Sequence, residues 1–175
     1  MAEVLKKDYD ELKVNRPKTL TFNGAICAEP GSITFSVSTL DGWSGEADTY
    51  PGHRIDRQKN TMEVPCLTLD AFLAKSGFKH VDYMTIDTEG SEAKLLSSWD
   101  PAKVVVDFIQ IECLIGPEMK LKQKEALVAL METKGYRLAH VITVAENDTL
   151  DLVFQRMSEV DLPHFKELKA SEIKV

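Results

Sequence analysis

The feature that most constrains the fold of this chain is a continuous apolar run, "VVVDFIQIEC", from Val104 to Cys113. A strand that is apolar at nearly every position is buried on both faces, and such strands belong to parallel sheets that helices cover. Helical patterns of apolar residues flank the run, around Leu95 on one side and Leu127 on the other. Because strands and helices alternate here, the sequence predicts an α/β fold with right-handed crossovers.

Weaker patterns give the remaining elements. Residues 32–39 alternate cleanly, with Ile33, Phe35 and Val37 on one face and serine or threonine on the other, as in a strand buried on one side. The turn residues "ENDT" separate the last two strands and indicate an antiparallel hairpin. In chain order we expect a helix over 3–14, strands over 19–28, 32–39, 62–66, 81–87 and 103–113, a helix after each of the last three strands, and hairpin strands over 136–144 and 150–157.

Two segments lack a clear pattern of this kind. Residues 40–60, "LDGWSGEADTYPGHRIDRQKN", are rich in glycine, charge and polar groups. We predict a long surface loop there, and loops of this length in compact domains are often functional. Residues 158–175 are charged, and we expect them to form a tail or a short helix.

Composition excludes several classes of function. The chain has 175 residues, enough for one domain with a sizeable core. Its formal charge of −7 and the absence of a basic patch argue against a nucleic-acid partner. With no apolar run of about 18 residues and no apolar signal core near Met1, we expect no membrane segment and a cytoplasmic location. The three cysteines, Cys27, Cys66 and Cys113, are then expected to be reduced and buried.

Two of the predicted strands end in a carboxylate, Asp87 after "VDYMTI" and Glu112 after "VVVDFIQI". Ligands of open α/β sheets bind at the carboxyl ends of the strands. Neighbouring strands lie about 4.8 Å apart, so the two carboxylates could face one small pocket. Three roles are open to such a pair: to hold a divalent metal, to take a proton from a substrate hydroxyl, or to bind a cation or a ribose.

A structural explanation competes with a functional one at the same place. Acids at the start of a helix cap free N–H groups and complement the helix dipole, which would account for one or two of Asp87, Glu89 and Glu92. Glu92 is most simply a solvated residue of the first helical turn. Capping explains less well an acid that directly follows six strand residues and precedes Gly90, a residue type that allows close backbone approach.

The motifs "VPCLTLDAFL", "HVDYMTIDTEGSEAKLL" and "VDFIQIE" resemble those of FkbM-type methyltransferases. That family's signature includes an apolar strand that ends in D-x-E-G-x-E, then a helix, and then a strand that ends in I-E or V-E. The resemblance extends over roughly Tyr9 to Arg156. It implies a class I, Rossmann-like fold and the transfer of a methyl group from S-adenosylmethionine, usually to an oxygen of a sugar or another small metabolite.

The resemblance also implies roles for individual residues. The loop after the family's third strand would lie near the adenine of the cofactor, and the ends of the next two strands would face the methyl donor and acceptor. The implied catalytic residues are Asp87, Glu89 and Glu112, and the implied cofactor-binding residues are Asn23, Gly24, Ala25, Ile26, Asp87 and Thr88. We expect no resident metal, although Asp87 and Glu112 are suitable ligands for a divalent ion.

The chain departs from the family in one respect. The family's first strand, its glycine-rich loop and the acid that closes its second strand should precede "YDELKVNRP", and this sequence does not contain them. We therefore expect residues 1–157 to form an incomplete methyltransferase domain, with a second chain or an oligomer completing the sheet and a small molecule as methyl acceptor. The alternative is a non-catalytic remnant, an interaction module that kept the scaffold and lost the cofactor site.

Overall fold

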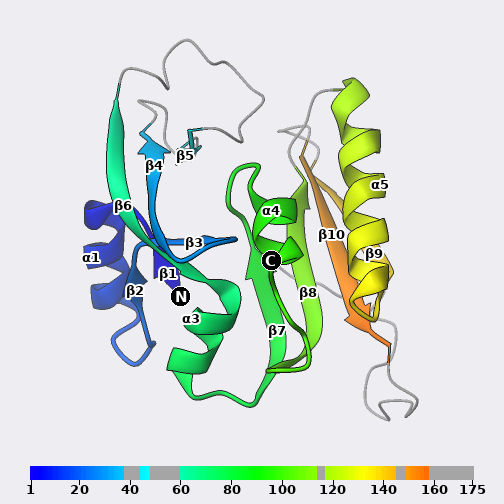
Figure 1. The fold of residues 1–175 in the computed structure, drawn as a ribbon, viewed down its shortest axis with the longest axis horizontal. Coiled ribbons are helices and arrows are strands. Elements are labelled where there is room, and N and C mark those ends of the chain that lie inside the picture. Colours follow the sequence, from blue (N-terminus) through cyan, green and yellow to red (C-terminus); the bar gives the residue numbers. More distant parts are fainter. Residues whose placement is uncertain (38–43, 48–59, 114–116, 145–148, 158–175) are drawn as a thin grey trace.

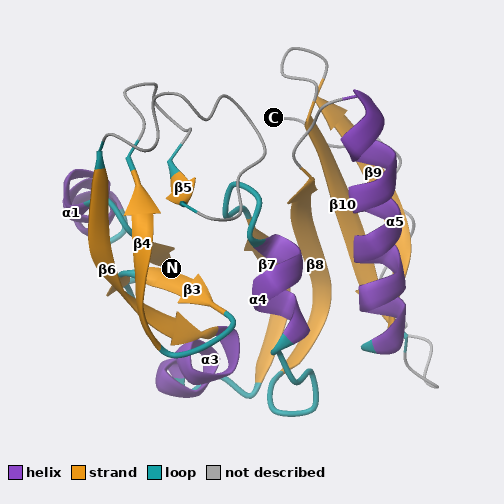
Figure 2. Cartoon of the chain, turned by 45° about the horizontal axis from the view of Figure 1, so that its top comes forward, coloured by secondary structure: helices purple, strands orange, loops and turns teal. Residues whose placement is uncertain are grey.

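A computed structural model describes residues 1–37, 44–47, 60–113, 117–144 and 149–157. The described residues form two four-stranded sheets that stand side by side and a small two-stranded sheet, with helices packed against the larger sheets (Figures 1 and 2). This mixed arrangement confirms the predicted α/β class. The described part of residues 40–60 includes a short strand where we had predicted only loop, and the predicted tail over 158–175 lies outside the described residues.

The first sheet has the strand order β3-β6-β4-β5. β3 (Ala25–Cys27) is parallel to β6 (Thr61–Thr68), whereas β4 (Gly31–Ser36) is antiparallel to both β6 and β5 (Gly45–Glu46). The predicted apolar face of β4 is confirmed, because Phe35 is buried and Ile33 and Val37 pack against the same cluster. The other face is not fully exposed as predicted, because Ser36 is buried as well. This smaller core consists of Ala25, Cys27, Phe35, Val64 and Cys66.

The N-terminal segment differs from the predicted pattern. The strand expected over 19–28 is divided into β2 (Phe22–Asn23) and β3 by Gly24, and β2 pairs in parallel with an unpredicted strand β1 (Ala2–Glu3). A Cβ atom at Gly24 would lie 2.6 Å from the backbone oxygen of Pro65, so only glycine fits this approach of two strands. The first helix, α1, covers Lys6–Asn15 and has no buried residue.

The second sheet has the order β7-β8-β10-β9. β7 (His80–Ile86) is parallel to β8 (Val105–Cys113), and β10 (Thr149–Arg156) is antiparallel to both β8 and β9 (Tyr136–Val144). The predicted hairpin is therefore confirmed. The apolar run that forms β8 has a parallel partner, β7, on one side only. Its neighbour on the other side is β10, the second strand of the hairpin, which is antiparallel to it.

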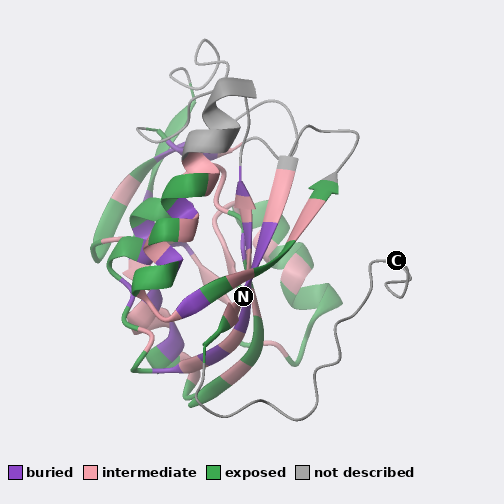
Figure 3. Cartoon of the chain, turned by 90° about the vertical axis from the view of Figure 1, so that its right-hand side faces the viewer, coloured by how far each residue is buried: buried purple, intermediate pink, exposed green. Residues whose placement is uncertain are grey.

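Two helices cover one face of the second sheet, α4 (Glu92–Ser97) over β7 and β8 and α5 (Pro117–Thr133) over the hairpin (Figure 2). The larger core lies between these helices and the strands, as the buried residues in Figure 3 indicate. Fully buried members of this core come from α4, α5, β8 and β10. They include Leu96, Val106, Ile109, Ile111, Leu127, Met131, Leu152 and Phe154.

The two sheets are connected through α3 (Leu69–Ser76), which lies between β6 and β7 in the chain and in space (Figure 1). α3 begins where the Thr68 side chain accepts a hydrogen bond from the Ala71 N–H, and it ends at Gly77, whose φ of 75° is typical of a glycine that ends a helix. A second link is the ion pair between Lys94 of α4 and the buried Glu46 of β5.

Cys27 and Cys66 are joined by a disulfide, with their Cα atoms 6.1 Å apart. The prediction of reduced thiols is therefore wrong for this pair. The parallel pairing of β3 with β6 places Cys66 opposite Ala25, which brings it diagonally next to Cys27. Sequence alone did not reveal that these two strands are neighbours. Cys113 is buried at the end of β8 and is not part of a disulfide.

Candidate functional site

The structure brings together the acids that end the two parallel strands. Ile86 pairs with Ile111, so Asp87 and Glu112, the next residue on each strand, lie level with one another. A carboxylate oxygen from each of Asp87, Glu89 and Glu112 lies within 4.8 Å of the other two. Three acids therefore converge at the carboxyl edge of the second sheet.

The loop from Asp87 to Ser91 turns back sharply enough to place Glu89 in this cluster. Glu89 has φ of 55° and Gly90 has φ of 105°, so two consecutive residues lie on the left-handed side of conformational space. Glycine adopts such values freely, whereas they are uncommon for glutamate. Gly90 is therefore needed for the turn itself, which is a physical reason for a glycine between the two glutamates.

Glu92 is completely buried, so the prediction of a solvated first-turn residue is wrong. Its Oε1 accepts hydrogen bonds from the Thr88 N–H at 2.9 Å, the Thr88 hydroxyl at 3.0 Å and the Gly90 N–H at 3.0 Å. The side chain thus folds back beneath the loop and satisfies two backbone donors that lie before the helix. Glu92 holds the acid-bearing loop in place, a role that sequence spacing did not reveal.

The cluster strongly affects the ionisation of Glu112. Burial raises the pKa of its carboxyl group to about 8, and the nearby charge of Asp87, a hydrogen bond with Asp87 and the charges of Glu89 and Glu92 add to the effect. Near neutral pH Glu112 therefore keeps its proton and shares it with Asp87. Such a pair has one group able to accept a proton and another able to donate one.

This perturbation predicts how stability depends on pH. The pKa of Glu112 is about 8 in the folded chain and about 4.5 when the group is free in the unfolded chain, so between these values only the folded chain binds the proton. Its contribution to stability is fully present below about pH 4.5 and is lost as the pH rises through about 8. We expect the free energy of unfolding, measured in urea, to fall over this range more steeply in the wild type than in Glu112→Gln. Parallel pH profiles for the two proteins would contradict the assignment.

A cavity of about 300 Å³ adjoins the acidic cluster. Residues from both sheets line it, including Gly24, Ala25 and Ile26 from the first and Asp87, Thr88 and Glu89 from the second. The two groups of residues for which the sequence predicts a common site are thus neighbours. Asn23 does not line this cavity. Its amide instead donates to the backbone oxygens of Glu3 and Val4 at 2.9 and 3.0 Å, which fixes the N-terminal segment beside β3.

A larger groove of about 790 Å³, which was not predicted from the sequence, lies beside the first cavity. Its walls are the outer side of β7, the helix α3 and residues 18–22, and Ile26 of β3 also contributes. β7 and β3 are edge strands of their respective sheets. The groove is mainly apolar, with side chains that include Leu69, Phe72, Leu73, Val81, Met84 and Ile86.

Fold and site together define an α/β protein with an acidic site at the ends of two parallel strands. The chain belongs to the methyltransferase FkbM domain family, whose model matches residues 5–138. This match includes both strand ends and supports methyl transfer as the general class of reaction. No curated protein and no solved structure matches the chain. Within the described residues, no helix is both long and apolar enough to cross a membrane.

Proposed function

We propose that this chain takes part in methyl transfer from S-adenosylmethionine to an oxygen of a small metabolite or sugar. The observation that carries the proposal is the convergence of Asp87, Glu89 and Glu112 beside a cavity that Gly24 and Ala25 also line, in a chain of the FkbM family. Methyl transfer to oxygen is an in-line displacement, so the alignment of donor and acceptor is the main requirement. A base is needed where the acceptor hydroxyl must lose its proton.

The residues present suit one side of such a cofactor. S-adenosylmethionine supplies its methyl group from a positively charged sulfonium. Asp87 and Glu89 would favour that positive charge, and Asp87 would accept the proton of an acceptor hydroxyl while Glu112 remains protonated beside it. Gly24 and Ala25 line the cavity, where they would present backbone and a small side chain to the cofactor.

We further propose that the groove between the two sheets receives β-strands carrying the glycine-rich loop that this sequence lacks. β3 and β7 are both edge strands, residues of both line the groove, and unpaired strand edges readily accept another strand. Strands placed between them would join the two sheets into one continuous, Rossmann-like sheet. The apolar lining fits a strand that is buried on both faces. A cytoplasmic location and a small-molecule acceptor remain predictions from the sequence.

Calorimetric titration with S-adenosylmethionine tests this proposal. We would compare the chain alone with a fusion that carries, at its N-terminus, the strand–loop–helix segment of another FkbM-family protein. We expect micromolar binding by the fusion and weakening by at least about tenfold in its Asp87→Asn variant, because one cluster carboxylate is lost. Asp10→Asn is the control, since Asp10 is exposed and lines neither cavity.

Each outcome of the titration is informative. Micromolar binding by the chain alone would mean that it needs no added strands for the cofactor. If a folded fusion shows no binding even at millimolar ligand, the proposal is overturned and a non-catalytic module becomes the better description. Equal loss of affinity in Asp87→Asn and Asp10→Asn would remove Asp87 from the site.

A further inference from the structure

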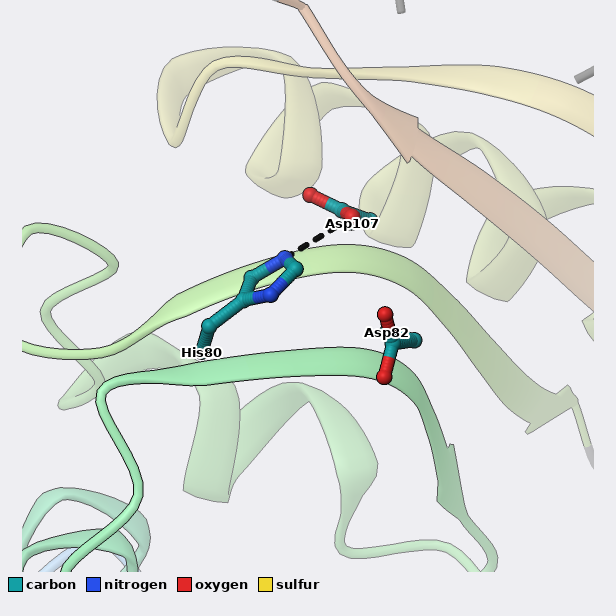
Figure 4. Close-up of side chains that lie close together, drawn as sticks. All are labelled: His80, Asp82 and Asp107. Carbon is teal, nitrogen blue, oxygen red and sulfur yellow. Dashed lines mark hydrogen bonds and ion pairs between the residues drawn. The ribbon is translucent and has the colours of Figure 1, made fainter. Parts of the chain in front are cut away.

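A second cluster of potential ligands lies at the opposite end of β7 from the acidic site. It consists of His80 and Asp82 on β7 and Asp107 on β8, which project together from the two strands (Figure 4). His80 and Asp82 are exposed, while Val81 and Met84 of the same strand pack against the helix-covered core. The cluster is therefore on the face of the sheet that α4 and α5 leave uncovered.

The geometry of this cluster is set by strand pairing. Val81 pairs with Val106 and Tyr83 with Phe108, so Asp82 lies level with Asp107, and His80 lies two residues before Asp82. The Nε2 atom of His80 is 2.8 Å from Oδ2 of Asp107, and one ligand atom from each of the three residues lies within 4.8 Å of the others. Ligands at about 2.1 Å from one cation are separated by at most ~4.2 Å, so small side-chain rotations would suffice.

The charge of the cluster also favours a cation. In the described part of the chain, no lysine or arginine forms an ion pair with Asp82 or Asp107, whereas Asp10, Glu46 and Asp70 each pair with a lysine. Apart from the imidazole of His80, which contacts Asp107, neither carboxylate has a basic partner there. The two carboxylates would balance a divalent ion, and the imidazole would complete a three-ligand set. One nitrogen and two oxygens suit zinc and its first-row neighbours better than magnesium or calcium, which prefer oxygen ligands alone.

We propose that His80, Asp82 and Asp107 form a binding site for a first-row divalent metal ion, with zinc as the best fit. The ion takes the position between Nε2 of His80 and the Asp107 carboxylate, with Asp82 as the third ligand and water in the open position. It links the beginnings of β7 and β8, and thereby supports an edge strand that has a partner on one side only. None of the three residues lines either cavity, so this site is separate from the proposed methyl-transfer site.

Calorimetric titration of the metal-free full chain with zinc chloride, and separately with magnesium chloride, tests the proposal. We expect one zinc ion per chain, a higher melting temperature with zinc, and no comparable effect of magnesium. His80→Ala and Asp82→Asn should each weaken zinc binding by at least about tenfold, because each removes one of three ligands. Circular dichroism of the metal-free variants establishes that they are folded.

Two matched controls locate the ion. His140→Ala removes another exposed histidine, on β9, and Glu112→Gln changes the other acidic cluster. Neither should alter zinc affinity. The proposal is overturned if folded His80→Ala binds zinc as tightly as the wild type, if no zinc binds at all, or if Glu112→Gln abolishes binding.

Discussion

Replacement of Glu92 by alanine is expected to lower the free energy of unfolding by about 3 kcal/mol, because it removes the acceptor of three hydrogen bonds inside the protein. The N–H groups of Thr88 and Gly90 would lose their partner, and each buried unsatisfied donor costs about 1–3 kcal/mol. Removal of a negative charge from beside Glu112 offsets part of this loss. The hydrogen bonds dominate, because two of them hold backbone groups of a turn in an uncommon conformation.

Urea unfolding of two further variants separates these effects. Glu92→Gln keeps an oxygen acceptor but removes the charge, so we expect it to cost less than half as much as Glu92→Ala. Glu125→Ala removes an exposed helical glutamate from α5 and should change stability by no more than about 0.5 kcal/mol. If Glu92→Ala is as mild as Glu125→Ala, the side chain does not hold the loop.

Replacement of Trp99 by alanine should cost about 4 kcal/mol, within the usual range for a buried tryptophan. Trp99 is 2% exposed, and its ring centroid lies 5.6 Å from that of Tyr136. The Tyr136 hydroxyl in turn donates to the backbone oxygen of Val106 at 2.7 Å. Trp99 thus anchors the end of α4 against the sheet, and α4 begins with the glutamate that supports the acidic loop.

Trp99→Phe provides the matched comparison. The indole Nε1 is buried and has no hydrogen-bond partner among the described residues, so phenylalanine removes an unsatisfied donor as well as volume. We expect a loss of less than about 2 kcal/mol in urea unfolding followed by circular dichroism. Equal losses for Trp99→Phe and Trp99→Ala would mean that packing against Tyr136 contributes little.

Several features of the fold could be predicted because a buried strand must be apolar along its own sequence. The run from Val104 to Cys113 is apolar because it is covered, and this property is visible without knowledge of its neighbours. Asp87 and Glu112 could be expected to meet because both follow strands in a parallel pair, and the structure places them at that position. Their chemical roles rest on the family resemblance and await the experiments above.

Other features depend on parts of the chain that are distant or on backbone conformation. Cys27 and Glu92 are two examples, because their partners could not be predicted from the sequence around them. The disulfide requires knowledge that β3 lies beside β6, and the burial of Glu92 follows from the left-handed turn at Glu89 and Gly90. Likewise, an apolar run does not reveal that one neighbour of β8 is antiparallel. Pairing and turn geometry therefore had to come from the structure.

The separation of the hydrophobic interior into two clusters bears on cooperativity. Each sheet has its own core, and a groove of about 790 Å³ lies between the sheets, so the packing that links them comes mainly from α3 and from Ile26 of β3. Domains that unfold in one step usually depend on a single continuous core. In a Trp43→Phe variant, the fluorescence of Trp99 reports the larger core, whereas loss of the β-signal in circular dichroism reports both sheets. Transitions that differ between the two probes would show that the halves unfold as separate units, and added strands that join the sheets would make the transitions coincide.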